Sequence, residues 1–144
     1  MTISRRHLLT AVAAGAATAA LPFPAWSAPH EILTLADETL RATFSNALII
    51  REPAQLRQAA DWLAAAPNRA LTGLLSDADG VLLMQMVARG SARWLWSDHH
   101  VFKDAPSSVW LRATAQDLAR LERAPATAST SGAGGAWFSF AAQS

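Results

Sequence analysis

The sequence predicts a small α/β domain over residues 28–125, built as a two-layer or three-layer sandwich with a mostly parallel sheet of about four or five strands. Short apolar runs alternate with stretches of helical periodicity through the middle of the chain, which is typical of β-α-β units. The length of this segment is also close to the commonest size of one domain, and the sequence has no internal repeat. A single domain is therefore expected.

The first elements are predicted from short apolar runs and from residues that open helices. Residues 32–35 are apolar, and the polar stretch that follows them is compatible with a helix capped by Asp37. Residues 47–50 are apolar and partly β-branched, which favours a strand. Pro53 comes soon after and is well placed to open a helix.

The clearest amphipathic helix lies between Pro53 and Pro67. Its apolar residues recur at helical spacing: Leu56, Ala59, Ala60, Leu63 and Ala64. Residues 70–75 then predict a second buried strand. Gly73 lies inside this strand, where a neighbouring backbone is expected to approach closely.

The segment after this strand admits two structures, and the choice between them decides the topology. In one, Ser76 or Asp77 caps a buried helix that ends at Gly90, since its Leu, Met, Gln and Ala residues are good helix formers. In the other, Asp79-Gly80 turns a β-hairpin and the domain is α+β. The helix is favoured because the composition and the stop at Gly90 agree.

Residues 93–97 predict a third strand, whose side chains alternate between two faces. If the strand continues, one face carries Trp94, Trp96, Asp98 and His100, and the other carries Leu95, Ser97 and His99.

One more short strand and a helix are expected before the end of the domain. Residues 109–111 are apolar and predict the strand. Thr114 with Asp117 three residues later resembles a capping pair, which predicts a helix from there to Arg123. Pro125 ends it.

The chain closes with a tether and an aromatic tail. Residues 126–135 are only Ala, Thr, Ser and Gly, the composition of a flexible tether. The tail, 136–144, contains Trp137, Phe138 and Phe140 and is costly to leave in water. We expect it to add a strand to the sheet of this domain. The alternative is that these three rings dock on a partner.

Residues 1–27 have the three parts of a secretory leader. Arg5 and Arg6 form the charged start, an apolar stretch follows, and small residues precede a predicted cleavage between Ser27 and Ala28. The prolines at the end of the apolar stretch shorten its helix below the length of a membrane span, so no stable span is expected after cleavage.

Ser4, the paired arginines, Leu8 and Leu9 resemble a twin-arginine (Tat) signal peptide. The resemblance covers residues 1–27 only. The chain departs from the family at Leu8, where Phe is frequent, and at Thr10, where Lys is frequent. The resemblance implies that the Tat translocase exports the folded protein and that signal peptidase releases it to the periplasm or the medium. Ordinary Sec export is the alternative.

Charge and composition exclude several classes of function. The chain has 12 basic and 11 acidic residues, and loss of the two leader arginines makes its net charge slightly negative, so neither nucleic acid nor an anionic membrane surface is an expected partner. The chain has no cysteine, which excludes disulfides, thiolate-ligated metals and clusters, c-type haem and a cysteine nucleophile. Any cofactor must therefore be held by His, Asp, Glu or non-covalent contacts, and none is evident.

Polar residues follow three of the predicted strands, at the edge where a largely parallel sheet binds its ligands. They are Arg51 and Glu52, then Ser76, Asp77 and Asp79, and then Asp98, His99 and His100. A carboxylate beside an imidazole suits divalent metal binding or proton transfer. Because His99 and His100 point oppositely on a strand, only one of them is expected to serve a site with Asp98.

The sequence contains no His-Glu-x-x-His zinc motif, Gly-x-Ser-x-Gly elbow or glycine-rich phosphate loop. We therefore expect an exported binding or accessory protein without catalysis, associated with a larger periplasmic partner. The alternative is a small metal-dependent or acid–base enzyme, or a metal carrier, that uses Asp98 with His99 or His100.

Overall fold

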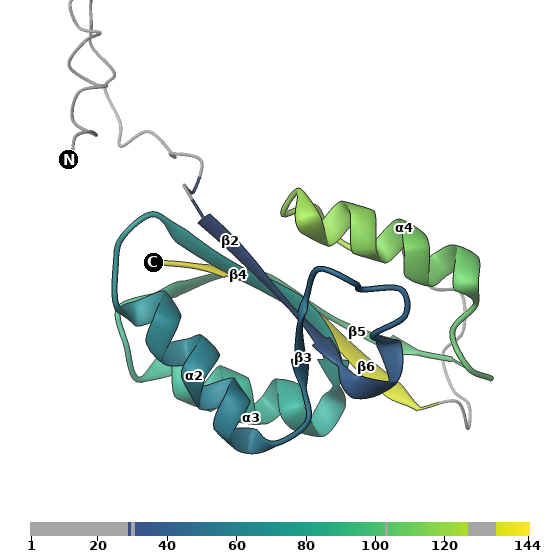
Figure 1. Ribbon diagram of the computed structural model, residues 1–144, viewed down its shortest axis with the longest axis horizontal. Helices are drawn as coiled ribbons and strands as arrows, with labels where there is room; N and C mark the ends of the chain where they lie inside the picture. The colour runs from purple at the N-terminus through teal and green to yellow at the C-terminus, as the bar shows by residue number, and fades with distance from the viewer. Residues whose placement is uncertain (1–28, 30, 103, 127–134) are drawn as a thin grey trace, which may run out of the picture.

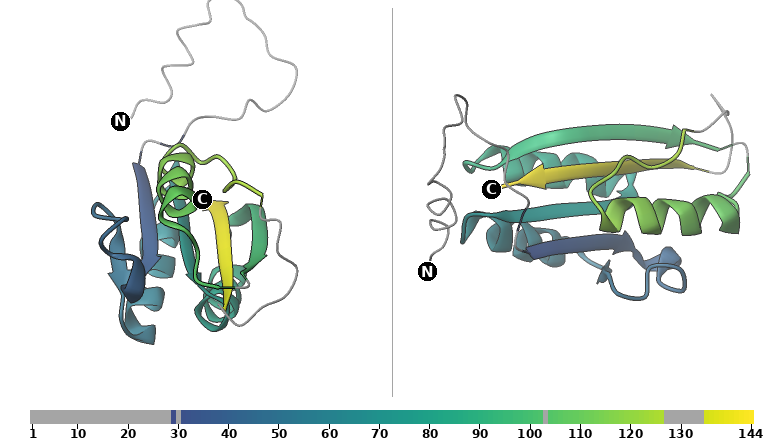
Figure 2. Two further views of the ribbon diagram at one scale, coloured as in Figure 1. Left: turned by 90° about the vertical axis from the view of Figure 1, so that its right-hand side faces the viewer. Right: turned by 90° about the horizontal axis from the view of Figure 1, so that it is seen from above.

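The computed structural model describes residues 29, 31–102, 104–126 and 135–144. Its elements are β2 (Glu31–Asp37), the short 3-10 helix η1 (Glu38–Leu40), β3 (Leu48–Ile50), α2 (Pro53–Ala64), β4 (Arg69–Ser76), α3 (Asp77–Ala88), β5 (Arg93–Val101), α4 (Ser108–Ala119) and β6 (Ala136–Gln143). Helices α2 and α3 cover one face of the five-stranded sheet and α4 covers the other, so the fold is a three-layer α/β sandwich (Figures 1 and 2). None of the described helices has the length and hydropathy of a membrane span.

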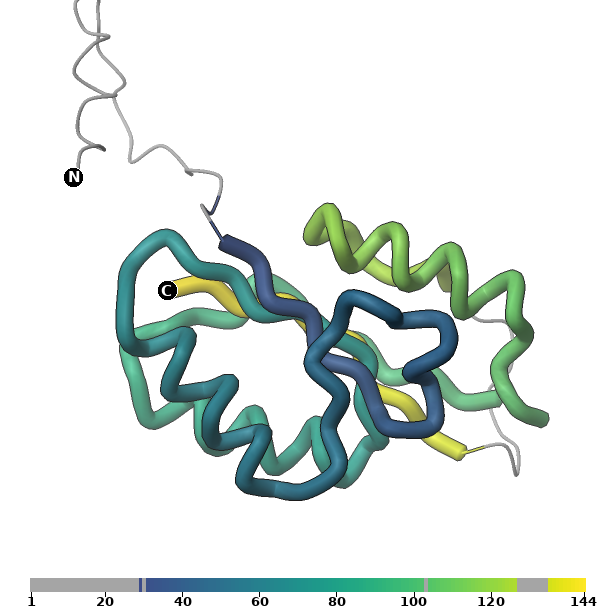
Figure 3. Tube along the Cα trace, viewed as in Figure 1, coloured from purple at the N-terminus to yellow at the C-terminus, as the bar shows by residue number. Residues whose placement is uncertain are grey.

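The strand order is β3-β2-β4-β6-β5, and the sheet is mixed. Strands β3, β2 and β4 are mutually parallel, whereas β6 pairs antiparallel with both β4 and β5. The two antiparallel ladders contain more residue pairs than the two parallel ones, so the prediction of a mostly parallel sheet is wrong. The cause is the aromatic tail, which joins its own sheet as predicted but lies between β4 and β5 and runs opposite to both (Figures 1 and 3).

The segment after β4 is a helix, which excludes the alternative of a hairpin at Asp79-Gly80. Ser76 is the N-cap of α3, and its Oγ accepts a hydrogen bond from the backbone N–H of Asp79 at 3.3 Å. The helix ends at Ala88, and Gly90 lies just beyond it, as the composition indicated.

The segment around α4 differs from the prediction. Residues 109–111 are in the first turn of the helix, because Ser107 caps it by accepting the N–H of Trp110 at 3.1 Å. Thr114 is buried in the middle of α4, so it is not the N-cap that the sequence predicted. The helix ends at Ala119, before the predicted Arg123. Three consecutive apolar residues fit a strand and a helical turn equally well, which explains the error.

Local predictions were better in the first half of the chain. Asp37 caps a helix as expected, but this helix is only the single turn η1, and the preceding strand extends to Asp37 itself. Helix α2 begins at Pro53 as predicted. The close approach expected at Gly73 is confirmed, since a Cβ there would lie 2.5 Å from the carbonyl oxygen of Leu35 on β2.

Two apolar clusters form the core, one on each face of the sheet. On the α2–α3 face the rings of Phe138 and Phe140 stack with centroids 5.6 Å apart, and Trp94 meets both edge-on. On the α4 face, Trp96, Trp110 and Trp137 pack around Leu74 and Leu118. The tryptophans therefore serve mainly as core packing.

A β-bulge in β5 places Trp94 and Trp96 on opposite faces of the sheet, whereas the sequence predicted both on one face. The pairing of β5 with β6 shifts between Trp94 and Trp96, so that these residues oppose the adjacent Ala142 and Ala141. As a result, Trp94 packs on the α2–α3 face and Trp96 on the α4 face. The period of two predicted from the sequence resumes only after the bulge.

The predicted leader (1–27), the bond between Ser27 and Ala28 and the interior of the predicted tether lie outside the described residues. The predicted 136–144 strand corresponds to β6 and belongs to the same sheet as the elements of 28–125.

Substitution of Gly80 by Ala tests how tightly α3 packs on β6. A Cβ at Gly80 would lie 2.8 Å from the Cβ of Phe138, whose position is fixed by the strand. We expect Gly80→Ala to lower the free energy of unfolding by about 1–3 kcal/mol, measured by chemical denaturation. Gly90→Ala is the matched control, because its Cβ would meet only ordinary contacts, 3.7 Å and more away. Equal stability of the two variants would contradict this packing.

Candidate functional site

The carboxyl edge of β4 and β5 holds an exposed acid–imidazole pair. Asp77, in the first turn of α3, has its Oδ1 2.7 Å from Nδ1 of His99 on β5. The His99 and Asp77 side chains are 59% and 45% exposed, respectively. Oδ1 makes no hydrogen bond of acceptable geometry with any described group. The His99 ring also packs against Phe138, with centroids 5.3 Å apart.

Asp98 lies on the opposite face of β5 and is engaged by a different residue. Its Oδ1 accepts a hydrogen bond from Nη1 of Arg123 at 2.7 Å. The same guanidinium lies over the ring of Trp96, 5.5 Å from its centroid. Arg123 therefore balances the charge of Asp98 and fixes the segment after α4 against the sheet.

His100 is part of the core on this second face. Only 4% of the residue is exposed, and its Nε2 lies 2.7 Å from Oγ of Ser139 on β6. Its ring meets Trp110 of α4 edge-on at 5.1 Å. Burial lowers the pKa of His100 below 6.5; the nearby Asp98 opposes this shift and His99 adds to it. His100 is thus a neutral structural histidine whose hydroxyl partner is equally buried.

These placements confirm that His99 and His100 point to opposite faces of β5. The residues predicted to form one site therefore lie on both faces of the sheet. Asp98 has neither imidazole as its partner, and His99 is paired instead with Asp77. Asp79 contributes its backbone N–H to the cap of α3. Within the described ranges, no three His, Asp or Glu side chains are grouped so that they could hold a metal ion.

Arg51 and Glu52 do not join these residues, although they follow a strand that ends at the same edge. They come after β3, which lies at one end of the sheet, whereas β5 lies at the other. Arg51 is 4.0 Å from Glu38, and Glu52 caps α2 in a capping box with Gln55.

Of the aromatic residues proposed to bind a partner, two lie in the core. Phe138 and Phe140 are 1% and 0% exposed, and both pack in the cluster between the sheet and the α2–α3 layer. Trp137 is half-buried on the α4 face. In this fold the two phenylalanine rings offer no surface to another molecule.

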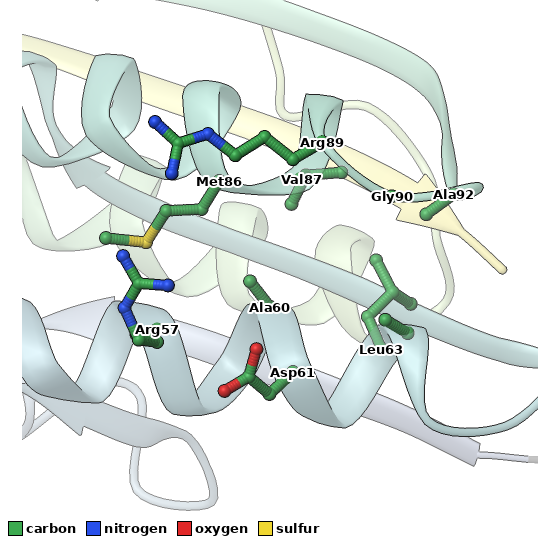
Figure 4. A pocket seen from close by; sticks show the side chains of 10 residues that line it. Arg57, Ala60, Asp61, Leu63, Met86, Val87, Arg89, Gly90 and Ala92 are labelled. Atoms are coloured by element: carbon green, nitrogen blue, oxygen red, sulfur yellow. The ribbon is translucent and has the colours of Figure 1, made fainter.

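Sequence reasoning missed a groove between α2 and α3, with a volume of about 220 Å³ (Figure 4). It is lined by Arg57, Ala60, Asp61, Leu63 and Ala64 from α2 and by Met86, Val87, Arg89, Gly90 and Ala92 from α3 and the loop after it. Small side chains face each other here: a Cβ on Gly90 would still lie 4.0 Å from the Cβ of Ala64. The small side chains at this point leave the space between the two helices unfilled.

Arginines stand on both walls of the groove. Figure 4 shows the guanidinium groups of Arg57 and Arg89 toward the same end, on either side of Met86, while Leu63 and Ala92 lie toward the other. Asp61 is the one acidic residue of the lining. None of the three charged side chains has an ion-pair or hydrogen-bond partner in the part of the chain that the structure describes.

A smaller hollow, of about 120 Å³, lies between α4 and residues 43–47 and has no charged side chain in its lining. Comparison of the chain with protein-family models, curated proteins and solved structures found no match in any of the three. The function proposed for the protein therefore rests on the predicted leader and on the geometry of these sites.

The burial of His100 predicts how stability depends on pH. Because the pKa of His100 in the folded protein is below 6.5, the unfolded chain binds a proton first as the pH falls. The free energy of unfolding should therefore decrease below about pH 6.5, with a slope of at most about 1.4 kcal/mol per pH unit from this residue. Chemical denaturation at about pH 7, 6 and 5 measures this pH dependence of the free energy of unfolding.

The variant His100→Gln should lose this part of the slope, and His99→Gln should keep most of it. The comparison isolates the contribution of His100 from that of the other titratable groups, which both variants retain apart from the histidine replaced. If His100→Gln and the native protein had the same pH dependence, the assignment of His100 as a buried neutral base would be wrong.

Proposed function

We propose that this protein is an exported, non-catalytic binding or accessory protein of the periplasm, carried across the membrane by the Tat translocase and released by signal peptidase. The groove between α2 and α3 is the observation that supports a binding role. It combines an apolar base with two arginines that have no partner among the described residues. The leader, residues 1–27, supports the exported destination.

The chemistry of the groove favours recognition over turnover. Its lining contains no histidine, serine or threonine, so it lacks an imidazole base and a hydroxyl nucleophile. Arginine stays protonated at all ordinary pH values, which makes it a poor proton carrier and a good anion binder. The lining is therefore better suited to binding an anion through Arg57 and Arg89 than to catalysis.

Association with a larger periplasmic protein remains part of the proposal, but it cannot use the rings of Phe138 and Phe140, which were the alternative prediction for the tail. Phe138 and Phe140 hold the core, so an exposed surface must carry the contact. Removal of β6 would therefore damage the fold and is unsuitable as a test of partner binding.

Filling the groove tests the binding role. We expect the native protein to be stabilised by at least one member of a panel of small anionic, neutral and cationic organic compounds, measured as a thermal shift. Ala64→Leu places a larger side chain beside Gly90 and should weaken that ligand about tenfold or more. Ala54→Leu, exposed on α2 and outside the groove, is the control.

Equal stabilisation of the native protein and Ala64→Leu would remove the groove as the binding site. A panel in which no compound shifts the melting temperature would argue against a small-ligand-binding function.

Acid–base catalysis at the carboxyl edge is the second candidate, and the 2.7 Å contact between Asp77 and His99 favours it. A carboxylate beside an exposed imidazole is a common arrangement for a general base. Asp77 replaces Asp98 in this version, because Asp98 is engaged by Arg123. Conversion of a panel compound by the native protein, abolished in His99→Asn, would support this candidate.

The leader can be tested independently of the domain. Replacing Arg5 and Arg6 by Lys should leave the protein in the cytoplasm, because the paired arginines are the most specific part of the Tat signal. Fractionation of cells followed by immunoblotting measures this. Undiminished export of the double variant would instead assign the chain to the Sec route.

A further inference from the structure

We propose that the α2–α3 groove binds a small organic monoanion, in which one carboxylate or phosphodiester group is joined to a short apolar body. This inference rests on the proposed binding function and names the class of ligand. It comes from the charges on the walls, the apolar base and the size of the groove.

The anionic group is placed by the two arginines. Arg57 comes from α2 and Arg89 from the C-cap of α3, and their guanidinium groups lie toward one end of the groove (Figure 4). Because both lack partners among the described residues, an incoming anion does not have to break an existing ion pair. A guanidinium presents a planar fork of N–H donors that matches the oxygen atoms of such an anion.

The apolar body is placed by the base of the groove. Leu63 and Val87 belong to the buried core and lie beneath the groove. The apolar surface that a ligand can cover comes from Ala60, Ala64, Met86 and Ala92, which are only partly buried or exposed. A ligand that covers these groups removes apolar area from water, which contributes to its affinity. An anion without an apolar body, such as inorganic phosphate, leaves this surface exposed and is expected to bind less well.

The size of the groove limits the ligand. Its volume of about 220 Å³ is below the range of roughly 300–1,000 Å³ that is usual for drug-sized ligands. A chain of a few carbon atoms with one head group fits this space, whereas a folded partner would reach only the rim. A small molecule is thus the better match.

Asp61 limits the ligand to a single negative charge. Its carboxylate stands on the α2 wall one turn from Arg57, so a ligand that brings a second negative charge is repelled. The set of two arginines and one aspartate has a net charge of +1, which one negative charge on the ligand balances.

Four probes test the proposal on the full-length chain: hexanoate, hexanol and hexylammonium, which are matched in size, and inorganic phosphate. Backbone amide shifts in NMR titrations report both the affinity and the place of binding. Hexanoate should bind with a Kd of about millimolar or tighter and shift the amides of residues 57–64 and 86–92. Each of the other probes should bind at least about tenfold more weakly.

Charge variants identify the groups responsible. The double variant Arg57→Gln/Arg89→Gln should weaken hexanoate by about tenfold or more, since it removes both charge-assisted contacts. Asp61→Asn should tighten it about two- to threefold. The matched control is Arg93→Gln/Arg112→Gln, which removes two exposed arginines outside the groove and should change the affinity less than twofold.

Several outcomes would overturn the inference. If hexanol or hexylammonium bound as tightly as hexanoate, or if the arginine double variant kept its affinity, the groove would bind by its apolar surface and the binding function would stand without the anion. If no probe shifted the groove amides, the inference would fail, and the panel with Ala64→Leu would separately decide the binding function. All these substitutions are at exposed side chains, and dispersed NMR spectra would confirm that the variants fold.

Discussion

The insertion of β6 between β4 and β5 is the interaction on which the rest of the structure depends. This strand gives β5 its pairing in the sheet and joins it to β4, so the position of every residue on β5 follows from it. It contributes Phe138 and Phe140 to one core, and its Ser139 contacts His100 on the opposite face. Its backbone also accepts the hydroxyl hydrogen bond of the buried Thr72 at 2.8 Å. One short segment thus joins both layers of the core.

Local patterns predicted much of the fold, because each of those elements carries its own signal. Pro53 and the apolar spacing after it marked α2, and the cap at Ser76 with good helix formers marked α3. The place of β6 in the sheet has no such signal, since a run of apolar residues says that a strand is buried but not which strands are its neighbours. The same limit explains residues 109–111, which have the composition of a strand and lie in a helix.

The candidate sites were harder to predict than the fold, for a similar reason. His99 and His100 were correctly expected to point apart, but their partners Asp77 and Ser139 are distant in the sequence and are brought close only by pairing of the sheet with α3 and β6. The groove had a still weaker signal. It results from what is missing between two helices, where Ala64 faces Gly90, and small residues on a helix usually indicate close packing instead. A hollow formed in this way depends on the separation of the helices, which the sequence does not state.

The central position of β6 has a consequence for biosynthesis. A ribosome makes the chain from its amino terminus, so β6 emerges after the other strands of the described sheet, and until then β4 and β5 lack the strand that joins them. Its pairing with β4 spans Ala70 to Gln143, a long loop closure of the kind that slows folding. The sheet can therefore be completed only after residues 136–143 have been synthesised. For the Tat route proposed here, which carries folded proteins, the synthesis and pairing of residues 136–143 decide when this domain becomes ready for export, although the predicted export signal lies more than 100 residues before them.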